Sequence, residues 1–392
     1  MTRRPEPPAE LEGAVRDIIE EVRTGGDAAV ISLTERFDKA ELGPEQLRVD
    51  PRELEASVGI VERDVLGGLR TAIANVRAVA QAQLREPVAV DLPEGQRVEV
   101  AEAPIQRAGV YVPGGRAPYP STVVMGAVTA RVAGVEQVAV CAPPGPGGRA
   151  HPAILAACVL CEVSEVYRMG GAQAIAALAL GTESVPAVDV IVGPGNAWVT
   201  EAKRQVFGQV GIDGLAGPSE LAVLATAGAD AELIALDLLA QAEHGPDSPL
   251  WLVSPERGLL DEVGDRVPGL EAIEVDSALA GLGVVEELAP EHLELVGEEA
   301  EALADRVRRA GCVFVGAGAG TAFGDYVAGS NHVLPTGGAA RFQSALSPAT
   351  FRRRMARVSL PGEAPTRLAP AGAALARAEG FPVHAESMER RA

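Results

Sequence analysis

The spacing of apolar residues predicts that the first part of the chain is helical. Between residues 9 and 86, apolar side chains recur at helical intervals in the stretches 10–26, 27–40 and 51–84. Two glycines close the first stretch, and Pro51 stands near the first turn of the third, where proline is well tolerated. Histidines, cysteines and clustered glycines are scarce here, so we expect scaffold helices.

From Arg97 onward, short runs rich in β-branched residues alternate with helical patterns. Most runs are followed by a glycine or proline turn and then by a helix, which predicts parallel βαβ sheets with helices on both faces. Ligands of such sheets bind beyond the carboxyl ends of the strands. The expected strands lie in AGVYVPGG, EQVAVCAPP, EVYRMGG, AVDVIVGPG, ELAVLAT, LWLVS, LELVG and CVFVG.

The expected strands fall into two sets, which predicts two similar αβ units. One set spans roughly residues 107–218 and the other roughly 219–345. The tail from Ser347 returns to helical, arginine-rich patterns. It is too short to bury a core of its own, so we expect it to pack on another surface.

The charge balance narrows the possible partners. The chain has 54 acidic and 34 basic residues among 392, a net charge of −20, which opposes binding to nucleic acid or an anionic membrane and favours small-molecule substrates. No apolar run approaches the roughly 18 to 20 residues of a membrane span, and MTRRPEPPAELEG contains no apolar stretch typical of a signal peptide. We therefore expect a soluble, cytoplasmic protein.

The four cysteines predict no disulfide framework. Cys141, Cys158, Cys161 and Cys312 lie in apolar segments, and the single CxxC falls inside the helical pattern HPAILAACVLCEV without a second pair to complete a zinc site. We expect buried core thiols.

The stretch DLLAQAEHGPDS carries the first candidate for chemistry. Gln241 and His244 are three residues apart, which places them on one face of an expected last helical turn. Gly245 and Pro246 then end the helix, so that face lies beside a loop. An isolated pair of this kind is more often a surface hydrogen-bonding pair than a ligand site.

Four of the five histidines stand beside polar or glycine-rich turns, which leaves a shared site and separate structural roles as equal interpretations: His244, His292, His332 and His384. Glu291 and His292 follow Pro290, as at the start of a short helix. This histidine could take a proton from an alcohol near neutral pH, and the glutamate could activate water. A solvated helix start with an acid favourable to the dipole is the competing interpretation.

Asp325, in AFGDYVAGSNH, could join the histidines at a metal. With Gln241, His244 and His384 it would form a nitrogen and oxygen set that suits zinc, although these residues come from distant parts of the chain.

The glycine-rich turns give weak signals for a nucleotide. GAGAGTAFGD after CVFV is not GxGxxG, and its glycines more often relieve a turn. GGAQA after EVYRM and GPGNAWVTEAK after VDVIV are better candidates, because each joins a strand to a helix start whose N–H groups can hold a phosphate.

Several long runs in order resemble the histidinol dehydrogenase family, and together they cover residues 104–392 almost continuously. The region before about residue 90 matches weakly and is shorter than usual, and Val383 stands where the family commonly has alanine. The runs are GVYVPGGRAPYPSTVVMGAVTARVAGV, GGAQAIAALALGTESVPAVDVIVGPGNAWVTEAKRQV, AGPSE, QAEHGPDS, APEHLELV, GDYVAGSNHVLPTGG and EGFPVHAESMERR.

The resemblance implies an α/β homodimer of interlocked subunits with shared active sites and two incomplete Rossmann-like domains. Such an enzyme oxidises L-histidinol to L-histidine, through bound histidinaldehyde, in two NAD-dependent hydride transfers. The implied division is a helical region, 1–106, packing in part on the second αβ domain; an NAD-side domain, 107–218; a zinc and catalytic domain, 219–345; and a helical segment on the partner subunit, 346–392.

The resemblance also implies roles for individual residues. His292 would deprotonate the alcohol and then the aldehyde hydrate, and Glu291 would activate the hydrating water. One zinc ion per subunit, which would position substrate, would be held by Gln241, His244, Asp325 and, from the partner subunit, His384. Substrate would contact these ligands and His292, together with Ser219, His332 and Glu379. NAD would contact Tyr111, Gln173 and Asn196.

Three alternatives remain open at this point. A paralogue could use the same zinc and NAD site on another amino alcohol or polar diol. A non-enzymatic αβ protein could hold a metal or nucleotide, and a zinc hydrolase could use the same ligands to activate water.

Overall fold

The computed structural model describes residues 8–114, 117–145 and 147–392, so Gly115 and Arg116 of the GVYVPGGRAPYP motif lie outside the described part. Contacts divide the chain into two compact units. The larger comprises Met1–Gln83 and Ile105–Phe351, and the smaller comprises Leu84–Pro104 and Arg352–Ala392.

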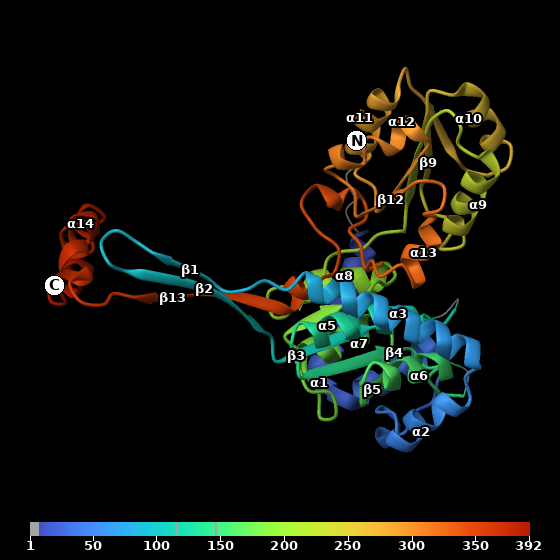
Figure 1. Ribbon diagram of the computed structural model, residues 1–392. Coiled ribbons are helices and arrows are strands. Elements are labelled where there is room, and N and C mark those ends of the chain that lie inside the picture. The colour runs from blue at the N-terminus through green and yellow to red at the C-terminus, as the bar shows by residue number, and fades with distance from the viewer. Residues whose placement is uncertain (1–7, 115–116, 146) are drawn as a thin grey trace. The chain divides into compact units, whose positions relative to one another are not determined.

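The first sheet of the larger unit has five parallel strands in the order β5-β4-β3-β6-β7 (Figure 1). The chain builds outward from β3 first on one side and then on the other, which places a topological switch point between β3 and β6. The strands are β3 (Arg107–Tyr111), β4 (Gln137–Ala142), β5 (Glu165–Arg168), β6 (Val190–Val192) and β7 (Gly211–Ile212). The helices between them are α4 (Pro120–Val123), the π-helical turn η3 (Val124–Val128), α5 (Thr129–Val132), α6 (Pro152–Leu160), α7 (Gly171–Leu180) and α8 (Ala197–Val206).

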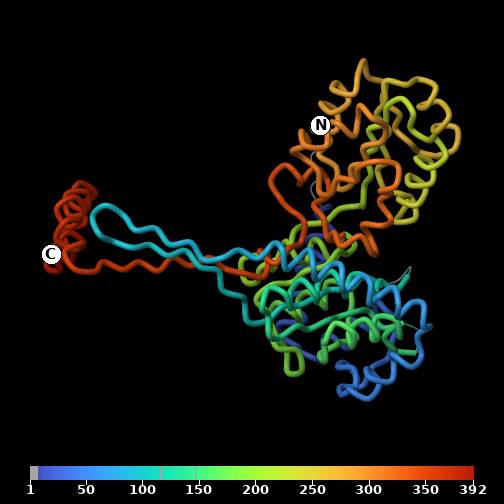
Figure 2. The backbone as a smooth tube through the Cα atoms, viewed as in Figure 1, coloured from blue at the N-terminus to red at the C-terminus, as the bar shows by residue number. Residues whose placement is uncertain are grey.

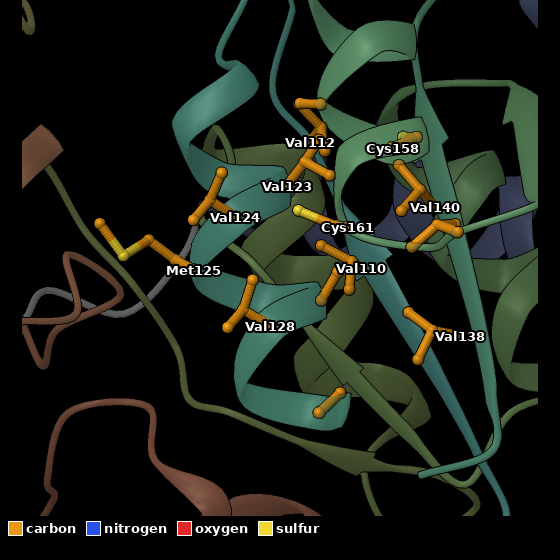
Figure 3. Close-up of a cluster of buried hydrophobic side chains, with 14 of the residues drawn as sticks. Val110, Val112, Val123, Val124, Met125, Val128, Val138, Val140, Cys158 and Cys161 are labelled. Carbon is orange, nitrogen blue, oxygen red and sulfur yellow. The ribbon is translucent and has the colours of Figure 1, made fainter. Parts of the chain in front are cut away.

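Apolar side chains cover both faces of this sheet. Val110 faces a cluster with α4, η3 and α6, whereas its neighbour Tyr111 faces a cluster with α7 and α8, as expected from the two-residue period of a strand. Figure 3 shows the first cluster, in which Val123, Cys158 and Cys161 lie around Val110. These two cysteines are buried, as the sequence predicts.

The second sheet repeats the topology of the first. Its five parallel strands have the order β10-β9-β8-β11-β12, so the prediction of two similar αβ units is confirmed. The strands are β8 (Leu221–Ala225), β9 (Leu250–Ser254), β10 (Glu271–Glu274), β11 (His292–Val296) and β12 (Cys312–Val315). The helices are α9 (Ala231–Ala242), α10 (Arg257–Gly264), α11 (Ala278–Leu288), α12 (Glu298–Glu301), η4 (Ala304–Arg306), α13 (Thr321–Tyr326), η5 (Ala339–Arg341) and η6 (Pro348–Phe351).

The helices of the N-terminal region pack mainly on the first sheet's helices. They are α1 (Ala9–Asp38), η1 (Pro44–Gln46), α2 (Pro51–Ala56), η2 (Ser57–Gly59) and α3 (Arg63–Ala82). The first two expected helices form one, interrupted at Gly26 (φ 54°), whereas the third is divided into α2, η2 and α3. Helix α1 contacts α7 and α8, and α3 contacts η3 and α5. One hydrogen bond joins α3 to the part of the larger unit that contains the second sheet: Asn75 Nδ2 donates to the Val327 carbonyl at 2.7 Å.

The smaller unit contains strands where the sequence predicts helix. β1 (Val88–Asp91), β2 (Arg97–Pro104) and β13 (Arg352–Ser359) form an antiparallel sheet, visible as three adjacent tubes in Figure 2. Arg354 and Arg357 of β13 pair across strands with Glu102 and Glu99. Cross-strand ion pairs of this kind stabilise a strand. The sequence of such a strand therefore need not show the alternation of apolar and polar residues from which strands are predicted. The unit ends in α14 (Ala364–Ala378) and α15 (Pro382–Glu389).

Within the described residues, no helix combines the length and apolar character needed to cross a membrane.

Candidate active site

The candidate catalytic residues lie at the amino ends of β8 and β11. Ser219 immediately precedes Glu220 and β8, while Glu291 precedes β11 and His292 opens it. Parallel pairing places His292 opposite Leu221, so the two strand starts are neighbours. Two expectations are thereby corrected: these residues are not at the carboxyl edge of the sheet, and His292 begins a strand because the LELV run, whose side chains are all buried, continues from it into the core.

Two helices bring further candidates to the same edge. A helix that follows a parallel strand runs back along the sheet, so its C-terminus returns to the amino edge. Gln241 lies in the last turn of α9 and Asp325 in the last turn of α13. Helix α9 ends at Ala242, so His244 lies in the following turn and not in the last helical turn as predicted. Its ring Nδ1 is 3.2 Å from the Gln241 carbonyl oxygen.

A chain of hydrogen bonds joins Gln241 to Glu291. Gln241 Nε2 donates to Ser219 Oγ at 2.8 Å, and this hydroxyl donates to Glu291 Oε2 at 2.6 Å. The Glu220 N–H also donates to Glu291 Oε2, at 3.0 Å. Burial raises the pKa of Glu291 to about 8, although the hydrogen bonds from Ser219 and Glu220 act in the opposite direction. Glu291 is therefore a carboxyl group that can exchange a proton near neutral pH.

The surroundings of His292 fix its neutral tautomer. Nδ1 lies 3.1 Å from the Glu220 carbonyl oxygen, which can only accept, so Nδ1 carries the proton. Nε2 lies 3.7 Å from Asp325 Oδ1. Burial lowers the pKa of His292 to about 4, so the ring is neutral at pH 7 and its Nε2 lone pair can accept a proton.

We expect the free energy of unfolding of the metal-free protein to fall as the pH drops from about 6.5 toward 4. In that window the unfolded chain binds a proton at this histidine and the folded chain does not, so acid favours unfolding. His292→Gln should reduce the slope of the free energy of unfolding against pH by up to about 1.4 kcal/mol per pH unit. Urea titrations across this range measure the difference, and equal slopes in the two proteins would contradict it.

His332 is held between the two halves of the larger unit. Its Nδ1 donates to the Asp325 carbonyl at 2.9 Å, and its Nε2 lies 3.1 Å from the hydroxyl oxygen of Thr122 on α4. Neighbouring Asn331 donates through Nδ2 to the Met125 carbonyl at 3.2 Å. Thr122 carries no signal in the sequence apart from its place in the PSTVV run that resembles the family.

The metal prediction is tested here by one buried atom. Oε1 of Gln241 is buried and has no hydrogen-bond partner among the described residues, a costly state that a cation could relieve. Asp325 lies within electrostatic reach of His244: burial raises the pKa of this carboxyl to about 6, and the histidine lowers it. The described residues contain no group of three or more His, Cys, Asp or Glu side chains arranged to hold a metal. The orphaned oxygen fits zinc, and the zinc set stays a prediction.

Glu379 and His384 belong to the smaller unit. Glu379 follows the last residue of α14, and His384 lies on α15 with its ring centroid 5.3 Å from that of Phe381. Val383 beside it is exposed. The assignment of Glu379 and His384 to the site stays a prediction.

The candidate NAD residues gather at the carboxyl edge of the first sheet. Tyr111 ends β3, Gln173 lies in the first turn of α7 after β5, and Asn196 caps α8 after β6. The hydroxyl of Tyr111 accepts from the Gly171 N–H at 3.2 Å. Gln173 is buried and its Nε2 lies 3.5 Å from an Asp38 carboxylate oxygen, a partner that the sequence did not reveal. Asn196 is exposed and accepts from two backbone N–H groups. NAD contact by these three stays a prediction.

The comparisons with known proteins agree along the whole chain. A family model described as histidinol dehydrogenase matches residues 1–392, so the likeness includes the N-terminal region that the motifs alone match weakly. A histidinol dehydrogenase of Synechococcus sp. is 44% identical over 97% of this chain and 92% of its own length. That of Zymomonas mobilis is 43% identical over 100% and 95%. A crystal structure of histidinol dehydrogenase from Elizabethkingia anophelis, 32% identical, superposes with a TM-score of 0.94 over 100% of this chain and 94% of that one. The chain belongs to the histidinol dehydrogenase family.

Proposed function

We propose that the protein oxidises L-histidinol to L-histidine with two molecules of NAD per product. The observation that carries this proposal is the buried pair at the start of β11, in which a neutral imidazole and a carboxyl group of raised pKa stand side by side. His292 Nδ1 and Glu291 Oε2 are 3.6 Å apart. Family membership supports the substrate and makes the chain an NAD-dependent oxidoreductase.

The first oxidation needs a base for the alcohol proton. In the proposed reaction His292 Nε2 takes the hydroxyl proton while the carbon-bound hydrogen leaves as hydride, which gives the aldehyde. In its ionised form Glu291 then takes a proton from the water that adds to the aldehyde carbon, and the aldehyde oxygen takes the proton that His292 gained, which gives the hydrate. His292 takes a hydroxyl proton of the resulting hydrate as a second hydride leaves, which gives the carboxylic acid. NAD, when bound, supplies the hydride acceptor for both oxidations.

The low pKa of His292 matters for this role. Because burial keeps the ring unprotonated at neutral pH, its lone pair is available before each oxidation. The proton it gains must pass to solvent or to another group between the two oxidations. Glu291, linked through Ser219 to Gln241, is held by hydrogen bonds that fix where its carboxyl group points.

Zinc belongs to the same proposal. Gln241, His244 and Asp325 would hold it together with His384 of the partner subunit. When bound, it would hold the substrate's imidazole and amine. Ser219, His332 and Glu379 would contact substrate around it, and Tyr111, Gln173 and Asn196 would contact NAD. The buried, unpartnered Oε1 of Gln241 supports this assignment.

We expect His244→Asn to lower zinc content and turnover together, because an imidazole ligand of zinc is lost. Metal analysis of purified protein and the histidinol assay measure both quantities. His151→Asn is the matched control, since His151 is exposed and caps α6 by accepting from the Ala153 N–H, a role that asparagine can fill. An unchanged metal-to-protein ratio in His244→Asn would remove this residue from the zinc site.

The shared active site is supported by the composition of the smaller unit. Its one apolar cluster among the described residues comprises buried Ala373, Ala376 and Ala385, with Met388 packed against them. Large apolar side chains of the same unit are exposed: Val88, Val90, Val100, Met355, Val358, Leu360, Leu375, Phe381 and Val383. A small core beside exposed apolar residues fits a unit that packs on a second copy of the chain. A cytoplasmic homodimer is therefore part of the proposal.

We expect that mixing Asp325→Asn and His384→Asn subunits restores roughly a quarter of the wild-type activity. Random exchange makes half of the dimers heterodimers, and each of these would have one intact site of two. Activity is measured after subunit exchange has been demonstrated by mass spectrometry. Each variant alone serves as the control, and no recovery despite exchange would contradict a shared site.

A further inference from the structure

Glu220, the last residue of the AGPSE motif, has no role in the chemistry above, yet it contacts both members of the catalytic pair. It is buried, with 5% of its surface exposed, at the junction between Ser219 and β8. A buried carboxyl group is retained in a fold only where other groups compensate for its desolvation.

The backbone of Glu220 fixes both side chains of the pair. Its N–H donates to Glu291 Oε2 at 3.0 Å, and its carbonyl oxygen lies 3.1 Å from His292 Nδ1. The same carbonyl also accepts from the His292 N–H at 3.3 Å. A displacement of this one residue would therefore move the carboxyl group and the imidazole together.

The side chain of Glu220 fastens that backbone to two other segments. Oε1 accepts from the Gly337 N–H at 2.8 Å, and the backbones of Glu291 and Gly338 lie close enough to lower the pKa of the same carboxyl group. Gly337 and Gly338 have φ values of 60° and 74°, which glycine adopts without strain, and this turn presents successive N–H groups to one carboxylate. His332 lies in the segment that leads into this turn.

We propose that Glu220 is a positioning residue that holds Glu291 and His292 in register for proton transfer. It touches neither substrate nor cofactor in this proposal and acts through the pair. The inference rests on the proposed function for its kinetic consequence, whereas the contacts themselves do not depend on it. Proton transfer needs hydrogen-bond distances, and a displacement near 1 Å can reduce a rate by about a hundredfold.

The test compares Glu220→Ala and Glu220→Gln with the wild type and with Glu232→Gln, a matched change at an exposed position on α9. In the histidinol assay we expect kcat of Glu220→Ala to fall about a hundredfold, with KM for histidinol within about twofold. Glu220→Gln should lose about tenfold, because its amide oxygen can still accept while its NH₂ group faces N–H donors. Glu232→Gln should match the wild type.

Hydrogen exchange gives a readout that does not need activity. The amides of Gly337 and Gly338 should exchange faster in both Glu220 variants than in Glu232→Gln. If the wild type failed to oxidise histidinol, the proposed function would be wrong, while exchange would still report the contacts. The positioning role is overturned if Glu220→Gln keeps the wild-type kcat, if either variant loses only stability, or if KM rises while kcat is unchanged. Glu220→Gln also serves if the alanine variant does not fold.

Discussion

His292→Asn should reduce kcat for histidinol oxidation roughly a thousandfold or more while leaving the fold and NAD binding intact. Asparagine is smaller than histidine and has no group that can accept a proton near neutral pH, so the general base is lost from both oxidations. The buried ring packs near Phe314, with 6.0 Å between centroids, so a modest loss of stability is also expected. Steady-state formation of NADH measures the change.

His151→Asn is the matched control for this change, because His151 is exposed and is not among the candidate site residues. It should retain the wild-type kcat. A His292→Asn protein that is folded, binds NAD and keeps more than about a tenth of the wild-type kcat would rule out His292 as the base.

Glu291→Gln should separate the two oxidations. The amide preserves the size of the side chain and can still accept from the Glu220 N–H, but it cannot take a proton from the hydrating water. We expect overall kcat to fall roughly a hundredfold or more, while the first hydride transfer stays within an order of magnitude of the wild type.

A rapid-mixing experiment with enzyme in excess over histidinol measures this separation. The wild type should form two NADH per histidinol, whereas Glu291→Gln should form one quickly and the second slowly. Two equally fast transfers would show that Glu291 does not activate the water. Equal slowing of both transfers would place its role in the first oxidation as well.

The buried strands and their division into two similar sets could be predicted from the sequence, because buried parallel strands leave a clear signal. VYV, VAVCA and AVLA are continuous apolar runs, LELV is apolar except for Glu294, and all expected strands are present. Strands β7 and β10 were missed because the first has two residues and the second, Glu271–Glu274, lies largely exposed at a sheet edge. Strand β13 was missed because its arginines pair with glutamates across the sheet and leave no alternation of apolar side chains.

Residue patterns single out Gln241, Glu291 and His292, the resemblance adds Ser219, and the structure brings these four residues together. The position of the candidate site at the amino edge of the second sheet could not be predicted, because the general rule places ligands beyond the carboxyl ends of the strands. The site gathers there because α9 and α13 carry Gln241 and Asp325 back along the sheet.

The contacts of Glu220 and Thr122 could not be predicted from the sequence for a different reason. Glu220 acts largely through backbone groups, and Thr122 reaches His332 across more than 200 positions of sequence. Neither contact follows from residue type or local spacing. Only the three-dimensional arrangement of β8, β11 and α4 brings these partners together.

One assay of the purified protein with L-histidinol and NAD, with zinc content determined in the same samples, tests the proposed function. We expect two NADH for each L-histidine formed, and loss of this activity when a chelator removes zinc, with recovery on adding zinc back. NADH formation from another amino alcohol but not from L-histidinol would contradict the proposed function.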